Sequence, residues 1–220
     1  MTVSIREVWE TLVSGDRAFV STVRRRLIFL SSYGRLIGSL ILLSHAFITP
    51  VSADILNATD PETGLASWTW RDRGVSLQLR QLLPDQTRAF FMGRGFRAGE
   101  ADRVGRACVF QTIFRNDGVK PVEYDLAEWS VQHRGKQLPL QTREVWEQRW
   151  LERNIGKGPR IAFRWALLPT RQRFEPGDYN WGMTSFGLAP GEGFDLSLRV
   201  SIGDEPVATE IPGITCAPDQ

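Results

Sequence analysis

From residue 75 to the C-terminus, the chain repeats one pattern of apolar and polar positions. A short alternating or wholly apolar run ends at Gly, Pro, Asn or Asp, and a new run begins. Short strands with a turn signal about every ten residues are typical of an antiparallel β-sandwich. The runs predict eight β-strands, at residues 75–82, 87–92, 107–114, 122–132, 161–168, 179–186, 194–202 and 207–214.

One segment departs from this alternation. Residues 142–155 place Trp146 and Trp150 four positions apart, with acidic residues early in the segment and a basic residue late. This spacing gives one apolar helical face, and the order of charges suits the helix dipole. The segment therefore predicts a single helix, with Thr142 as its N-cap and Gly156 just beyond its end.

The turn at residues 115–125 has the sequence Arg-Asn-Asp-Gly-Val-Lys-Pro-Val-Glu-Tyr-Asp. It resembles the turn between two central strands in immunoglobulin-like domains of secreted bacterial proteins. We therefore expect residues 54–220 to form one mostly β domain, an immunoglobulin-like antiparallel β-sandwich with one short helical insertion. Such a fold carries many functions and by itself indicates none of them.

The N-terminal part of the chain has the order of a secretory signal peptide. A basic cluster, Arg24-Arg25-Arg26, is followed by an apolar run over 36–48 and by the small residues of Val51-Ser52-Ala53. This pattern predicts a signal peptide over residues 1–53, cleaved between Ala53 and Asp54. Residues 1–22 exceed an ordinary basic region, and we interpret them as an extension from a misassigned start, with Val23 as the initiator.

The same segment has two alternative interpretations, an uncleaved membrane anchor and a twin-arginine signal. An uncleaved membrane anchor is disfavoured because the apolar run 36–48 is shorter than the roughly 20 residues that a spanning helix needs. A twin-arginine signal would use Arg25 and Arg26, followed by the large apolar residues 28–29. We favour cleavage and the general secretory route, which place the protein in the periplasm and leave membrane attachment only to an uncleaved signal.

Charge excludes one class of partner. Residues 1–53 hold six arginines and three acidic residues, so the remainder keeps 21 of the 27 basic residues against 22 of the 25 acidic ones. A nearly neutral domain lacks the basic face that neutralises phosphates, and we expect no nucleic-acid binding. Two cysteines, Cys108 and Cys216, follow the signal, and in an oxidising compartment they predict one structural disulfide.

Catalytic and metal-binding patterns are weak. His133 is the one histidine after residue 53, and no serine lies in a nucleophile-elbow sequence. His133, Met92, Met183 and the two cysteines show no ligand spacing for a metal. The sequence thus predicts no enzyme activity and no cofactor, and it leaves a metal-handling role as the least favoured alternative.

The domain is unusually rich in tryptophan, because seven of the chain's eight tryptophans follow residue 53. Trp68 and Trp70 are two positions apart and would share one face of a sheet. The remaining rings either pack the helix onto the sheet or form an exposed aromatic surface. We chose a candidate interaction surface from the aromatic and apolar residues of the helix and of segment 174–188: Trp146, Trp150, Tyr179, Trp181, Met183 and Phe186.

The function predicted from these observations is binding. The leading hypothesis is an accessory protein for another periplasmic or envelope protein. The alternative is a carbohydrate- or small-ligand-binding module that uses exposed tryptophans. An apolar rim around the aromatic residues would favour a protein partner, whereas coplanar rings with polar neighbours would favour a sugar.

Overall fold

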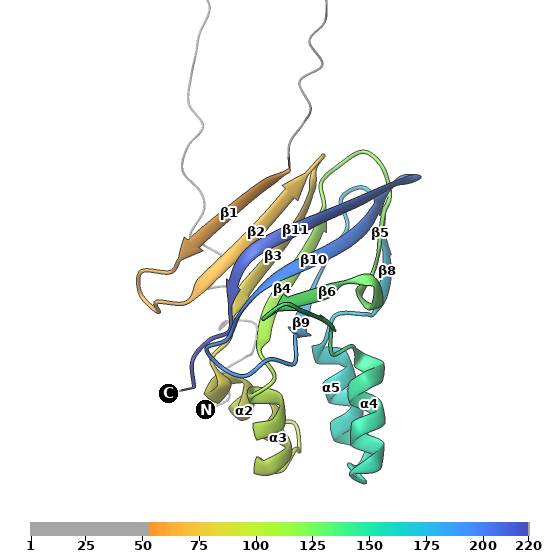
Figure 1. Cartoon of the computed structure of the whole chain (residues 1–220). Coiled ribbons are helices and arrows are strands. Elements are labelled where there is room, and N and C mark those ends of the chain that lie inside the picture. The colour runs from red at the N-terminus through yellow and green to blue at the C-terminus, as the bar shows by residue number, and fades with distance from the viewer. Residues whose placement is uncertain (1–52, 220) are drawn as a thin grey trace, which may run out of the picture. The chain divides into compact units, whose positions relative to one another are not determined.

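Two antiparallel β-sheets pack face to face in the computed structural model, which describes residues 53–219 (Figure 1). The domain is mostly β, which confirms the predicted β-sandwich. The predicted signal peptide lies outside the described residues except for Ala53, which packs against the core immediately before the first strand.

The first sheet has the strand order β1-β2-β3-β4-β9, so that β1 and β9 are its edges. Each neighbouring pair is antiparallel. Its strands are β1 (Asp54–Thr59), β2 (Ala66–Asp72), β3 (Val75–Gln81), β4 (Val109–Asn116) and β9 (Tyr179–Ser185).

The second sheet is built around β10, which pairs with β11 and with both β5 and β6. Beyond these, β8 pairs with β5 and β7 pairs with β6. A short 3-10 helix, η1 (Leu126–Glu128), connects β5 to β6. The strands are β5 (Val122–Asp125), β6 (Ser130–His133), β7 (Lys136–Pro139), β8 (Arg171–Phe174), β10 (Gly193–Ile202) and β11 (Glu205–Thr215).

Alternation along the strands fills the space between the sheets. In β3, Val75, Leu77 and Leu79 point inward and are buried, while the residues between them are more exposed. Trp68 and Trp70 share the inward face of β2, as their spacing predicts. Burial of alternate side chains from both sheets forms one continuous hydrophobic core.

The prediction of a single helical insertion is wrong, because residues 53–219 contain four α-helices, which lie at one end of the sandwich (Figure 1). They form two consecutive pairs. The first pair connects β3 to β4 and the second connects β7 to β8. The helices are α2 (Pro84–Met92), α3 (Ala98–Gly105), α4 (Arg143–Glu152) and α5 (Lys157–Ala166).

The segment predicted as a strand at 87–92 belongs to α2. Pro84 occupies the first helical turn, where its missing N–H costs nothing, and Gln86 accepts a hydrogen bond from the Leu83 backbone N–H. Thr87 and Phe91 lie four residues apart and are both buried. Pro84 and Asp85 therefore begin a helix.

The segment predicted as a strand at 161–168 is mostly α5. Gly156, expected just beyond the preceding helix, is instead the N-cap of this one. The preceding helix, α4, begins after its predicted N-cap, Thr142. It ends at Glu152, three residues before the end of the predicted segment 142–155. Phe163 is the buried residue of α5. Ile161 and Trp165 are exposed and lie on the opposite side of the helix.

A second aromatic core lies under the helices. Phe91, Phe96, Trp146, Trp150 and Phe163 are all buried and contact one another. Edge-to-face and offset stacking of such rings stabilises the packing beyond the area that it buries. This core attaches the helices to the end of the sandwich through buried Val109 of β4.

Two links hold the C-terminal residues against this end. Cys108 and Cys216 form the predicted disulfide, 108 residues apart in sequence. Asp219 accepts two hydrogen bonds from the guanidinium of Arg88 in α2, each 2.7 Å long. Arg88 also binds Asp85 and Asp102, so one cation joins α2, α3 and the C-terminal segment.

We predict that the double substitution Cys108→Ala/Cys216→Ala lowers the free energy of unfolding by as much as about 4 kcal/mol, because the bridge closes a long loop in the unfolded chain. Urea unfolding with and without reductant measures this effect. Reductant should destabilise the wild type and leave the double variant unchanged. Equal stability of the oxidised wild type and the variant would contradict the prediction.

A second prediction concerns acid stability. Hydrogen bonds from Arg88 lower the pKa of Asp219. Burial alone would raise the pKa of Asp102, but hydrogen bonds from Arg88 and Arg106 outweigh it and lower that pKa too. A lowered folded-state pKa gives stability that is present above the unfolded value of about 3.9 and is lost as the pH falls below it.

Arg88→Met should therefore reduce the loss of unfolding free energy between about pH 7 and about pH 3, relative to the wild type. Arg199→Met, on the outer face of the second sheet, is the matched control, since no carboxylate pairs with Arg199 among residues 53–219. Chemical denaturation at the two pH values gives the comparison. If Arg88→Met loses as much unfolding free energy between the two pH values as the wild type does, Arg88 does not stabilise the domain through Asp102 and Asp219.

Candidate interaction surface

The outward face of β9 carries two large exposed rings. Tyr179 and Trp181 are 57% and 53% exposed, and they alternate with Gly182 and Thr184, which are buried on the inward face. Met183 follows on the outward face and is half-buried. Strand alternation thus places Tyr179, Trp181 and Met183 on one side of the sheet, as their spacing requires.

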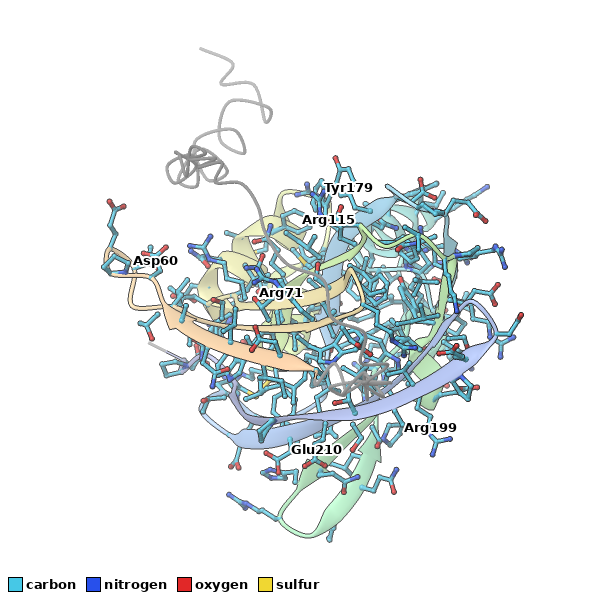
Figure 2. The ribbon with its side chains drawn as sticks, turned by 90° about the horizontal axis from the view of Figure 1, so that it is seen from above. Asp60, Arg71, Arg115, Tyr179, Arg199 and Glu210 are labelled. Atoms are coloured by element: carbon cyan, nitrogen blue, oxygen red, sulfur yellow. A yellow bond between two sulfur atoms is a disulfide. The ribbon has the colours of Figure 1, made fainter. Side chains whose placement is uncertain are left out.

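The neighbouring strand β4 supplies the partners of these rings. Arg115 lies opposite Tyr179, and Ile113 lies opposite Trp181. The Arg115 guanidinium carbon is 4.9 Å from the centre of the Tyr179 ring, which is a cation–π contact. Figure 2 shows these two side chains together, on the side of the sandwich away from Arg199 and Glu210 of the second sheet.

Helix α5 adjoins the same edge of the sheet. The residues after the helix run beside β9, where Leu167 bridges to Met183 and the Leu168 N–H donates to the Met183 carbonyl at 3.0 Å. Gly182 permits this approach. A Cβ atom there would stand 2.9 Å from the Leu168 nitrogen, closer than real Cβ contacts come.

Two exposed apolar side chains lie on the outer face of α5. Trp165 is 80% exposed and Ile161 is 45% exposed, four residues apart on the helix. Phe163 points the other way, into the aromatic core. We call the four exposed residues Ile161, Trp165, Tyr179 and Trp181 the β9–α5 edge.

Three residues of the predicted surface are not on it. Trp146, Trp150 and Phe186 are at most 2% exposed. Trp146 and Trp150 stack at 5.1 Å and pack against Phe163, so the apolar face of α4 covers the aromatic core. Phe186 packs between the sheets against Phe194. These three rings pack in the interior, and for Trp146 and Trp150 this is the alternative in which tryptophans pack the helix against the domain.

Trp165 was missed as a surface residue because its segment was predicted to be a strand. A strand would place Ile161, Phe163 and Trp165 on one face, whereas a helix separates Phe163 from the other two. Read with the helical period, Phe163 falls on the opposite side from this pair.

Other candidate chemistry is not assembled in the described residues. His133 Nδ1 is 2.8 Å from the Gly193 carbonyl oxygen, and His133 Nε2 is 3.3 Å from Glu192. Within residues 53–219 no three His, Cys, Asp or Glu side chains come together as metal ligands. The same range contains no helix with the length and apolar character of a membrane span.

A comparison with known proteins found no matching family model, no matching curated protein and no matching solved structure. The proposed function therefore rests on the amino-acid sequence and on the described residues.

The close approach at Gly182 generates a prediction about how the edge is positioned. Gly182→Ala should destabilise the domain by about 1–3 kcal/mol, because the added methyl group forces residues 166–168 away from β9. Thermal unfolding measures the loss, and near-ultraviolet circular dichroism reports the environment of the tryptophans. Gly158→Ala, where a Cβ atom meets nothing within 4 Å, is the control. Similar stability of both variants would contradict the packing described here.

Proposed function

We propose that the chain is an exported accessory protein that binds another periplasmic or envelope protein through the β9–α5 edge. The observation that carries this proposal is the presence of Trp165, Tyr179 and Trp181, all more than half exposed, on two adjoining elements. Exposed aromatic rings in such numbers are costly unless a partner covers them.

The surroundings of the rings favour a protein over a sugar. Ile161 of α5, Met183 of β9 and Ile113 of the neighbouring strand β4 lie on the outer faces of their elements and give this edge aliphatic residues. Arg115 adds positive charge beside Tyr179. Trp, Tyr and Arg surrounded by aliphatic contacts form the usual composition of protein-binding hot spots, whereas sugar platforms need polar neighbours to bind hydroxyl groups.

The compartment rests on two supports. The disulfide between Cys108 and Cys216 suits an oxidising environment, and the N-terminal sequence has the order of a secretory signal. We place the mature protein, from Asp54 onward, in the periplasm. The immunoglobulin-like character of the sandwich is part of the proposal, supported by the turn sequence at 115–125.

A photo-crosslinking amino acid at position 165 or 181 tests the proposal in the native envelope. We expect both positions to crosslink to the same protein, identified by mass spectrometry. Val119, which is 92% exposed in the connection between β4 and β5, is the control position and should not give that adduct.

With the partner identified, Trp165→Ser/Trp181→Ser should weaken its affinity by about thirtyfold or more, the effect expected for hot-spot residues. Val119→Ser should bind as the wild type does. The same adducts from all three positions, or no adduct from the edge, would refute the proposal. Wild-type binding on a glycan array that the double substitution abolishes would replace the protein partner with a carbohydrate.

A further inference from the structure

A groove separate from the β9–α5 edge lies between α3 and α4. Its volume is about 740 Å³, within the range of small-molecule sites. Four arginines line it, two from α3 and its end and two from α4 and its end: Arg103, Arg106, Arg149 and Arg153. None of its lining residues belongs to the β9–α5 edge.

The positive charge of the groove is not neutralised within the domain. Its two carboxylates are already engaged, because Asp102 binds Arg88 and Arg106, and Glu152 accepts a hydrogen bond from Gln148. Arg103, Arg149 and Arg153 form no ion pair with any carboxylate in residues 53–219. The groove lining thus holds four arginines against two carboxylates, which leaves a net charge of +2 on one concave site.

Two tryptophans and a glutamine form the inner wall of the groove. Trp146 and Trp150 line it, and their buried indole Nε1 atoms have no hydrogen-bond acceptor in the described structure. Gln141 also lines it, and its buried Oε1 has no donor there. These atoms are buried behind the groove surface, so a ligand in the groove does not contact them, and the arginines are the groups that would bind it.

The walls are held in place before any ligand binds. Arg88 fixes α3 to α2 through Asp102 at 2.9 Å. The Trp146 and Trp150 rings are anchored in the aromatic core, and the Arg149 guanidinium carbon lies 5.0 Å from the Trp146 ring centre. Contact with a ring face restricts this arginine, so less conformational entropy is lost when it binds an anion.

We infer that this groove binds a small ligand bearing phosphate or carboxylate groups with at least two negative charges. Guanidinium forks match the oxygen pairs of both groups and donate paired, charge-assisted hydrogen bonds to them. Three unpaired arginines require more than one negative charge for neutralisation. The β9–α5 edge remains free in this arrangement, so the ligand and the protein partner occupy different surfaces.

Isothermal titration calorimetry of the mature protein at low ionic strength tests the inference, with inorganic phosphate, pyrophosphate and citrate as probes. We expect one-site saturation by at least one probe, weakened by added salt because exposed charges are screened. Saturation by the phosphate probes identifies phosphate as the recognised group, and saturation by citrate identifies carboxylate. Quenching of tryptophan fluorescence should report the same affinity.

The variant Arg103→Gln/Arg153→Gln should weaken that binding about tenfold or more, because it removes charge-assisted hydrogen bonds. Arg199→Gln removes one positive charge from the outer face of the second sheet and should bind as the wild type does (Figure 2). If the double variant does not fold, the single variants Arg103→Gln and Arg153→Gln decide the question. The inference is overturned if no probe saturates the wild type or if the groove variants bind as tightly as Arg199→Gln.

Discussion

The ring of Phe163 is the contact on which the helical end of this domain depends. It touches Phe91 of α2, Phe96 of the following connection, and Trp146 and Trp150 of α4, with ring centres 4.9–5.8 Å apart. Four short segments that could not fold alone are thereby joined into one buried cluster. Removal of this ring would leave a void where the helices meet.

Both candidate sites follow from this packing. With Phe163 turned into the cluster, the opposite side of α5 presents Ile161 and Trp165 outward, beside the exposed rings of β9. With Trp146 and Trp150 held by the same cluster, α4 presents Arg149 over the groove that it forms with α3. The packing around Phe163 therefore positions both the exposed rings of the β9–α5 edge and the arginines of the groove between α3 and α4.

The connection between the helices and the sandwich is reinforced from the other side. The disulfide at Cys108 and Cys216 and the ion pair of Arg88 with Asp219 attach the last residues of the chain to the start of β4 and to α2. Because Arg88 also binds Asp102, this attachment reaches α3, one wall of the groove. The C-terminal segment thus supports a site to which it contributes no lining residue.

The sequence by itself determined the features that depend on local periodicity or on the chemistry of single residue types. Strict alternation predicted β3, the spacing of Trp68 and Trp70 predicted that they share one sheet face, and the charge order of 142–155 predicted α4. The cysteine count predicted the disulfide. The two-residue spacing of Tyr179, Trp181 and Met183 placed them on one face of a strand, and in the structure this is the outward face of β9.

Only the tertiary structure decided the rest. Short apolar runs such as 87–92 and 161–168 fit a strand or a buried helix equally well, and contacts with the aromatic core selected the helix. Whether a tryptophan is buried depends on what packs against its element, so Trp146 and Trp150 became core while Trp165 became surface. The groove has no local signature at all, because its arginines come from two helices that meet only in the folded chain.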